Sequence, residues 1–239
     1  MIDLDSPLRT YSTPTPGGDV VEYVVRLGTN DAALVGGIVA EDEYHLADLP
    51  PLSGWAIDIG AHIGTVALAL AADHRDLRVI AVEALTDNVI VLRQAVAVNG
   101  LEGRVIVEHA GASEGKDPVH VVYGWSHAEN QPDDYMRDSR FIGNMVGPND
   151  STLTEVCTPL SLGTILERHG IDRVALLKID CEGCEWSFLR SPEIGRVDLI
   201  LGEYHDAPFF EGIVELLGET HEVEHLSGTN VGHFRAVAR

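Results

Sequence analysis

The sequence predicts an α/β fold built around a doubly wound, mostly parallel sheet. From residue 55 to residue 220, short apolar runs that suit buried strands alternate with segments that suit helices. The chain has 239 residues, 45% of them hydrophobic, which is enough for one complete core. Two segments at 222–228 and 233–239 indicate a closing hairpin that completes seven strands and leaves the C-terminal strand antiparallel.

Residues 1–50 precede this alternation and are expected to form an N-terminal extension to a domain at 51–239. Prolines and glycines in 1–18 predict an irregular lead-in, whereas 20–28 has the composition of a strand. A short helical lid is expected at the end of the extension. There, Tyr44 either covers a bound ligand or packs the extension onto the core.

Residues 114–156 interrupt the alternation and are long for a connection within a compact domain. They contain a candidate strand at 119–124, followed by aromatic and arginine side chains such as Trp125 and Arg137. Loops of this length are often lids or binding loops, so we expect the segment to shape a substrate pocket. The alternative is a surface excursion without contact to a ligand.

The first strand, turn and helix of the alternation lie at residues 55–73. The strand is apolar apart from Asp58 near its end, as in strands that are buried on both faces. A turn of small residues leads into the helix and lets backbone N–H groups approach a ligand closely. The small residues of this turn are Gly60, Ala61 and Gly64.

The second strand, at 78–82, is followed by Glu83. A carboxylate at the tip of this strand can accept hydrogen bonds from both hydroxyls of a ribose. The third strand runs into small residues at 110–113, which leave room for a flat adenine ring at the same edge of the sheet. The three strand ends therefore predict a ligand that contains adenosine.

The turn distinguishes between ligands of this type. A dinucleotide fingerprint has the spacing G-x-G-x-x-G, whereas here three residues separate Gly60 from Gly64. Asp58 would repel a pyrophosphate but suits a cation. S-adenosylmethionine carries a sulfonium, an amino group and a ribose, and it therefore fits both Asp58 and Glu83. A nicotinamide-dependent dehydrogenase, a non-catalytic cofactor-binding module and a tight turn without any ligand remain as alternatives.

The formal net charge of −22 disfavours nucleic acid and anionic membranes as partners, although solubility alone also explains it. No apolar run is long enough to span a membrane, and the first ten residues lack the basic and hydrophobic regions of a signal peptide. We therefore expect a cytoplasmic protein with a small-molecule substrate. A homo-oligomer is compatible with the sequence.

Three cysteines occur, at Cys157, Cys181 and Cys184, and their odd number favours a reducing compartment. Cys181 and Cys184 form a C-x-x-C motif, but no second pair stands at the spacing of a zinc site. We therefore interpret them as two small packed side chains rather than as zinc ligands.

Charged and polar residues also end two later strands. One apolar run contains Lys178 and ends at Asp180, and strand alternation puts both on one face, where the lysine could neutralise a carboxylate. A second run ends with Glu203 and His205. The carboxyl ends of neighbouring parallel strands meet at one edge of a sheet, so we expect these groups at the mouth of the ligand crevice.

In this order, the segments resemble the class I S-adenosylmethionine-dependent methyltransferases of the FkbM family. The resemblance covers most of residues 55–206 and is carried by AIDIGAHIGTVALAL, AVEALTDNVIVLRQAVAVNGL, VIVEHAGAS, SLGTILERHGIDRVALLKIDCEGCEWSFL and VDLILGEYH. It implies a Rossmann-like fold, S-adenosylmethionine as cofactor, and methylation of a hydroxyl on a sugar, macrolide or other secondary metabolite. The sequence departs from the family at Ala84 and Leu85, where a proline often follows the acidic residue.

The resemblance also implies which residues line the cofactor. They are Asp58, Gly60, Ala61, Gly64, Glu83, Asn88 and Ala112.

An alcohol acceptor needs a general base or a metal ion, and the candidates are Asp180, Glu203 and His205. In one version His205 takes the proton and a carboxylate orients it. In another, Asp180 binds a divalent cation together with Glu203 or His205. We favour the version without a metal. One alternative is a structural role, in which Asp180 and Glu182 cap the next helix and Glu203 pairs with Lys178. Another is N-methylation of an amine.

Overall fold

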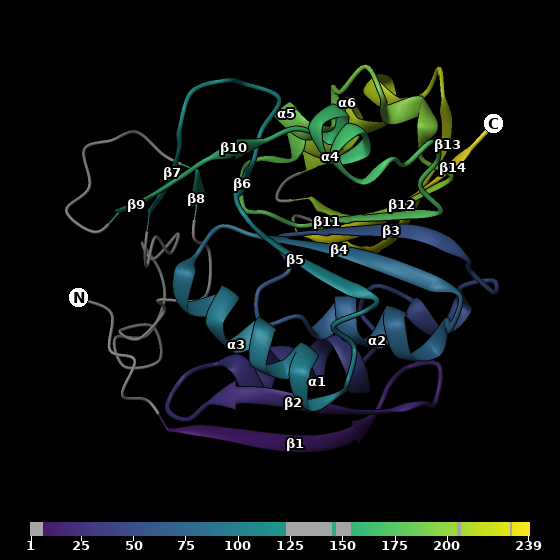
Figure 1. The fold of residues 1–239 in the computed structure, drawn as a ribbon. Coiled ribbons are helices and arrows are strands. Elements are labelled where there is room, and N and C mark those ends of the chain that lie inside the picture. The colour runs from purple at the N-terminus through teal and green to yellow at the C-terminus, as the bar shows by residue number, and fades with distance from the viewer. Residues whose placement is uncertain (1–6, 123–144, 147–153, 205–206, 230) are drawn as a thin grey trace.

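A seven-stranded sheet runs through the centre of the protein, which is described by a computed structural model over residues 7–122, 145–146, 154–204, 207–229 and 231–239 (Figure 1). The strand order is β13-β14-β12-β11-β3-β4-β5. The five strands from β12 to β5 are parallel, and β14 is antiparallel to both of its neighbours. This confirms the predicted fold class. The strands are β3 (Gly54–Ile59), β4 (Leu77–Glu83), β5 (Val105–His109), β11 (Leu176–Ile179), β12 (Leu199–Tyr204), β13 (His221–Gly228) and β14 (Gly232–Ala238).

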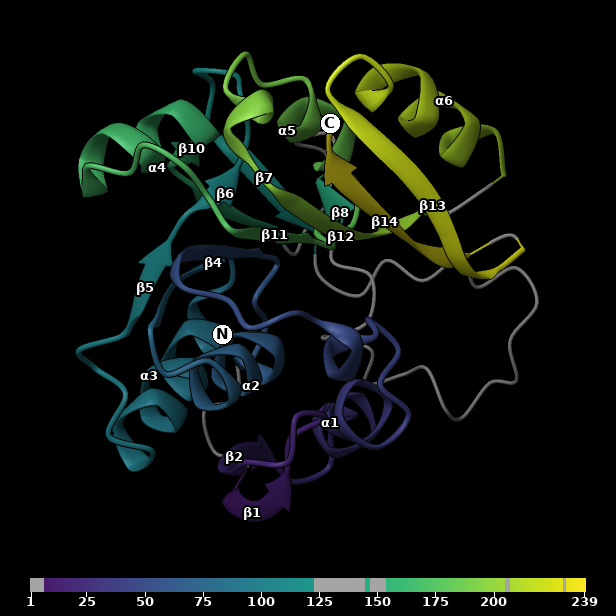
Figure 2. The ribbon, with the colours of Figure 1, turned by 90° about the vertical axis from the view of Figure 1, so that its right-hand side faces the viewer.

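Helices cover both faces of the sheet (Figures 1 and 2). Side chains of β3 alternate between two cores: Ala56 belongs to the core beneath one set of helices, while Ile57 and Ile59 belong to the other. Alternation of this kind explains why a strand buried on both faces is almost entirely apolar. On the first face lie α1 (Asp31–Ala40), α2 (Thr65–Asp73) and α3 (Thr86–Val98). On the second lie α4 (Leu162–His169), α5 (Glu185–Leu189) and α6 (Ala207–Leu217).

The N-terminal extension begins with an antiparallel hairpin of β1 (Leu8–Pro14) and β2 (Val20–Arg26), which corrects the expectation of an irregular lead-in. The sequence of β1 has no apolar alternation, which agrees with its mostly exposed side chains. It is a strand because its backbone pairs with β2 along its whole length. Asp73 anchors the hairpin turn because its carboxylate accepts hydrogen bonds from Gly17 N and Asp19 N at 3.1 and 3.3 Å.

The inward side chains of β2 share a core with α2 and α3, so the extension packs on the helices of the first face (Figure 2). Short strands and two 3-10 helices complete the described chain. They are β6 (Gly111–Ala112), β7 (Val119–Val122), β8 (Met145–Val146), β9 (Thr154–Cys157), β10 (Pro159–Leu160), η1 (Leu46–Asp48) and η2 (Ile194–Arg196). The predicted strand at 119–124 corresponds to β7, whereas Trp125 and Arg137 lie outside the described residues.

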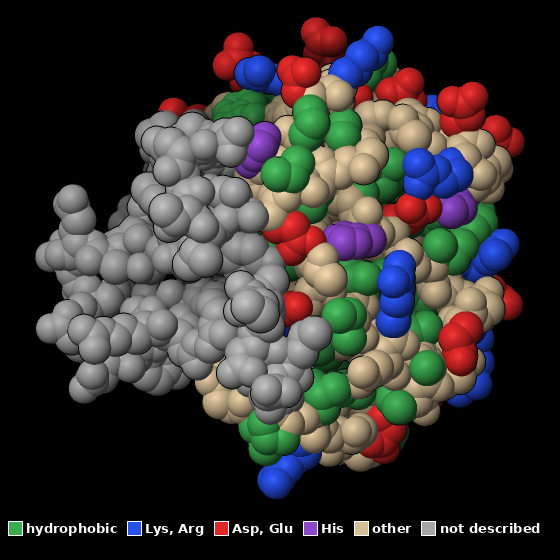
Figure 3. Space-filling model, turned by 60° about the vertical axis from the view of Figure 1, so that its left-hand side comes forward, with side chains coloured by type: hydrophobic (Ala, Val, Ile, Leu, Met, Phe, Trp, Pro, Cys, Tyr) green, Lys and Arg blue, Asp and Glu red, His purple; other side chains and the backbone are tan. Residues whose placement is uncertain are grey.

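Acidic and basic side chains are interspersed over the described part of the face drawn in Figure 3. None of the helices in the described ranges has the length and apolar composition needed to cross a membrane.

Candidate active site

A cavity of about 310 Å³ lies at the carboxyl ends of the parallel strands, a size that suits a small ligand. Residues at or just beyond the ends of β3, β4, β5, β11 and β12 build its wall. The predicted site residues that line it are Gly60, Ala61, Glu83, Asn88, Ala112, Asp180 and Glu203. Asp58 and Gly64 stand outside this lining, and His205 lies outside the described residues.

The turn after β3 needs glycine at two positions. Gly60 has φ +73°, and a Cβ there would lie 1.7 Å from the backbone oxygen of Asp180. Gly64 has φ +91°, and a Cβ there would lie 2.2 Å from Leu92 Cδ1. Gly60 thus allows β3 and the loop after β11 to approach each other beside the cavity, while Gly64 allows α2 to pack on α3.

Glu83 is 7% exposed at the tip of β4, and the protein fixes both of its carboxylate oxygens. Oε2 accepts a hydrogen bond from the backbone N–H of His62 at 2.8 Å. Oε1 accepts from Leu85 N at 2.8 Å and from Asn88 Nδ2 at 3.2 Å. Burial raises the pKa of Glu83 despite these hydrogen bonds.

His62 is a cavity residue that the sequence analysis missed. It has φ +51°, in the left-handed region, and burial lowers the pKa of its imidazole to about 4. The available signal was a large polar side chain within the otherwise small segment GAHIG.

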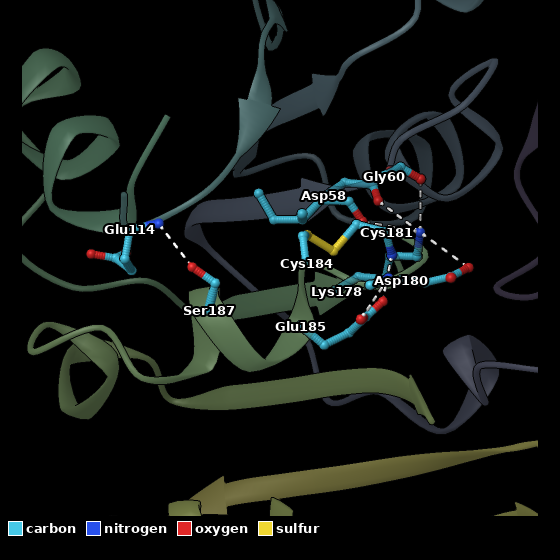
Figure 4. The surroundings of a disulfide bond; sticks show 11 residues. Asp58, Gly60, Glu114, Lys178, Asp180, Cys181, Cys184, Glu185 and Ser187 are labelled. Carbon is cyan, nitrogen blue, oxygen red and sulfur yellow. Dashed lines mark hydrogen bonds and ion pairs between the residues drawn. A yellow bond between two sulfur atoms is a disulfide. The ribbon is translucent and has the colours of Figure 1, made fainter. Parts of the chain in front are cut away.

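Asp58 is fully buried, and its Oδ1 lies 3.3 Å from Lys178 Nζ (Figure 4). Lys178 Nζ also donates a hydrogen bond of 3.0 Å to Gly60 O, and the same nitrogen lies 3.8 Å from Asp180 Oδ2. Burial alone would lower the pKa of Lys178, but the charges of Asp58 and Asp180 outweigh it, so the pKa is raised. The predicted pairing of this lysine with neighbouring carboxylates is therefore confirmed.

Carboxylates gather at the other end of the cavity. Asp180, Glu182 and Glu203 each offer an oxygen within 4.8 Å of the others, a group that could bind a divalent cation. Burial first, and then the charge of Asp180, raises the pKa of Glu203 to about 10. Glu203 also shares a hydrogen bond with Asp180, so the raised pKa belongs to a pair of carboxylates that face each other in the cavity wall.

The N-terminal extension contributes to the same wall through Leu34, Ile38, Glu43 and Tyr44. The Tyr44 hydroxyl donates a hydrogen bond of 2.6 Å to Asp180 Oδ2, and the side chain is 3% exposed. Tyr44 thus lines the cavity and also packs the extension onto the core.

Cys181 and Cys184 form a disulfide, with their Cα atoms 5.5 Å apart (Figure 4). This corrects the interpretation of the two residues as packed thiols. Glu182 and Gly183, between them, have positive φ, and the Glu185 carboxylate accepts hydrogen bonds from Cys181 N and Gly183 N at 2.9 Å. Cys157 is buried and is a free thiol.

Several solved structures are similar to this chain. The N-terminal domain of human METTL16 in complex with SAH is 13% identical, with a TM-score of 0.46 over 87% of this chain and 68% of that one. Precorrin-6y C5,15-methyltransferase from Geobacter metallireducens is 12% identical, with a TM-score of 0.46 over 83% and 86%. TYW2 from P. horikoshii in complex with MeSAdo is 14% identical, with a TM-score of 0.48 over 97% and 70%.

No curated protein matches the chain in sequence. The family model of the methyltransferase FkbM domain matches residues 58–230, which include the end of β3, the turn, Glu83 and the strand ends near Asp180 and Glu203. A match over this much of the chain, on a sheet with the expected strand order, establishes its family: the chain belongs to the FkbM methyltransferases.

Proposed function

We propose that the chain is an S-adenosylmethionine-dependent methyltransferase that methylates a hydroxyl group of a small molecule. The observation that carries the proposal is one continuous cavity, which extends from Glu83 at the tip of β4 to Asp180 just after β11 and Glu203 near the end of β12. The first end suits a ribose, and the second suits the removal of a proton from an acceptor.

The cavity wall has polar groups suited to the cofactor. Thr65 lines the cavity, and its buried Oγ1 has no hydrogen-bond partner among the described residues. Such an atom fits a polar ligand better than an apolar one. Glu83 and Asn88 would hold the ribose, while Leu85 and Ala112 would flank the adenine. Asp58 would act through Lys178 or through water, since it does not line the cavity.

S-adenosylmethionine supplies, when bound, a methyl group on a sulfonium that an acceptor oxygen displaces. Asp180 would accept the proton of the acceptor hydroxyl, with its Oδ2 oriented by Tyr44. The raised pKa of Glu203 favours a proton on that carboxyl group, which would leave Asp180 as the basic member of the pair. His205 belongs to the proposal as an alternative base. A divalent cation on Asp180 with Glu203 or His205 is the less favoured version.

N-methylation of an amine is the second candidate, and the carboxylates at the acceptor end favour it. Glu43, Asp180, Glu182 and Glu203 line this end. A cationic amine would find complementary charge there. Because the amine must lose its proton before it reacts, its methylation should accelerate as pH rises through the pKa of the amine.

We also propose that the acceptor is a small molecule and that the protein binds neither nucleic acid nor membranes. A cytoplasmic location is part of the same proposal. The net charge of −22 supports the first two, because a polyanion would be repelled.

The test combines binding with methyl transfer. Calorimetry should detect binding of S-adenosylhomocysteine and no binding of NAD. Binding of NAD alone would indicate a dehydrogenase instead. Methyl-labelled cofactor and a panel of alcohols and amines then identify the acceptor. In single turnovers Asp180→Asn should reduce the rate by about 100-fold or more, with unchanged affinity for S-adenosylhomocysteine. The exposed acid Glu222, changed to Gln, is the control. An unchanged rate in Asp180→Asn would remove Asp180 from the chemistry.

A further inference from the structure

Arg26 and Asp31 form a buried pair in the N-terminal extension, before the first residue of the family match at 58. Arg26 ends β2, and Asp31 begins α1. Arg26 Nε donates to Asp31 Oδ2 at 2.8 Å and Nη2 donates to Oδ1 at 2.9 Å, while the backbone N–H of Arg26 also donates to Oδ2. The side chains are 7% and 0% exposed. This two-point contact fixes the plane of the guanidinium.

The pair reaches beyond itself toward the cavity. Arg26 Nη2 donates a hydrogen bond of 2.8 Å to Asn88 Oδ1. The same nitrogen is 3.5 Å from His62 Nε2, and Asp31 Oδ1 is 3.7 Å from that ring atom. Asn88 and His62 both line the cavity, whereas Arg26 and Asp31 stand behind its wall.

Asn88 and His62 are also the residues that fix the two ends of the Glu83 carboxylate. Asn88 Nδ2 donates to Oε1 at 3.2 Å, and His62 N donates to Oε2 at 2.8 Å. An arginine can only donate, so Asn88 must present its oxygen to Arg26 and its NH₂ to Glu83. Arg26 therefore selects the amide orientation that Glu83 requires.

From these contacts we infer that Arg26 is a positioning residue for the cofactor ribose, acting through Asn88 and His62 on Glu83. The inference rests on the proposed function, in which Glu83 binds the ribose hydroxyls. Asp31 belongs to the same extension as Arg26, so the contacts to Asn88 and His62 are the ones by which Arg26 reaches the domain that holds the cavity. Those contacts end on two residues that hydrogen-bond the two oxygens of Glu83.

The test measures binding of two ligands by calorimetry: S-adenosylhomocysteine and its 2′,3′-dideoxy analogue, which lacks the ribose hydroxyls. Arg26→Met should lower the affinity for S-adenosylhomocysteine by about tenfold. It should lower the affinity for the dideoxy analogue by less than about twofold, because only the first ligand has ribose hydroxyls that Glu83 can bind. Arg26→Lys should lie between Arg26→Met and the unchanged protein, since lysine keeps the charge without the planar fork. In the background of Glu83→Gln, Arg26→Met should have little further effect.

Asn99→Ala is the matched control. Asn99 joins α3 to β2 of the same extension, because its side chain exchanges two hydrogen bonds with the backbone of Glu22 at 2.9 and 2.8 Å. It does not line the cavity. This variant should lower the melting temperature without changing the affinity for either ligand.

Equal weakening of both ligands by Arg26→Met, or an unchanged affinity for S-adenosylhomocysteine in the folded variant, would overturn the inference and leave the proposed function intact. An unchanged protein that binds the two ligands equally would overturn the inference together with the proposed contact between Glu83 and the ribose, and would leave the methyltransferase activity itself to the test of methyl transfer. If Arg26→Met does not fold, Arg26→Lys and Arg26→Gln provide the same comparison. Failure of the unchanged protein to bind S-adenosylhomocysteine would instead overturn the proposed function, and the inference with it.

Discussion

Glu83 has both carboxylate oxygens occupied by N–H groups of the protein, yet its side chain lines the cavity. Each oxygen of an ionised carboxylate can accept more than one hydrogen bond, so the lone pairs that remain can meet a ligand. The protein thus fixes the group before a ligand arrives, and binding need not restrict it further.

Asp58 was predicted to contact the ligand, and in the structure it pairs with Lys178. The sequence placed an acid near the end of the first strand, and the structure places the ammonium of the neighbouring strand against it. The pairing satisfies Lys178 where both side chains are buried.

At Gly60 the cost of a single methyl group can be predicted. Gly60→Ala should lower the free energy of unfolding by about 1–3 kcal/mol, because the Cβ would overlap Asp180 O at a positive φ. Chemical denaturation measures the change. Gly103→Ala, where the Cβ would meet nothing within 4 Å, should be nearly neutral. Equal stability of the two variants would contradict the close approach of β3 and the loop after β11.

At the scale of elements, the loop between β11 and α5 forms the part of the cavity wall where the carboxylates gather. It contains Asp180 and Glu182, closes with the Cys181–Cys184 disulfide, and contacts Gly60 through the Asp180 backbone. A covalent link across so short a loop restricts where the two carboxylates can lie. Both cysteines line the cavity as well.

The disulfide predicts a specific pattern of thiol labelling. Denatured protein treated with a maleimide should gain one adduct, at Cys157, and three adducts if a thiol reductant is added first. Mass spectrometry of the intact chain measures this. In Cys157→Ser the count without reductant should fall to zero. Three adducts without reductant would show that Cys181 and Cys184 are not bonded in the purified protein.

At the scale of the whole molecule, the cavity is shared between the central sheet and the N-terminal extension. Strand tips supply the polar groups, and the extension supplies Tyr44 in the wall and Arg26 behind it. The extension also shares the core beneath the first face of the sheet. Folding of the extension and formation of the cavity are therefore coupled.

Acid should destabilise the folded protein through His62. Its pKa is about 4 when folded and about 6.5 in an unfolded chain, so between these values only the unfolded state binds the proton. The free energy of unfolding attributable to His62 therefore falls as pH falls through this window. Glu203, with its raised pKa, acts in the opposite direction between about pH 10 and 4.5, so the comparison needs a variant.

Relative to His62→Asn, the unchanged protein should lose about 1–2 kcal/mol of stability between pH 7 and pH 4.5. Asparagine suits this position because it tolerates the left-handed backbone. Denaturant unfolding at the two pH values measures the difference. His45, whose side chain is 43% exposed and which also has a positive φ, is changed to Asn as the control. A difference that does not vary with pH would mean that the imidazole is not buried as described.

Much of the fold followed from patterns that do not depend on distant contacts. The apolar runs before Asp58 and Asp180 form strands β3 and β11 where the sequence predicted them. Parallel strands place their carboxyl ends together, so the sequence could also bring Glu83, Asp180 and Glu203 to one edge. The sequence did not predict strand β1, because this strand is defined by backbone pairing and its side chains are exposed.

Local patterning by itself determined the strand and helix order, the family resemblance and the acids at the strand tips, because periodicity and turn chemistry are written in neighbouring residues. Only the tertiary structure decided that Lys178 meets Asp58, that Cys181 bonds Cys184, and that Arg26 reaches Asn88. Contacts such as Arg26 to Asn88 join residues 62 positions apart, and hydrogen-bonding partners at that separation depend on how whole elements pack.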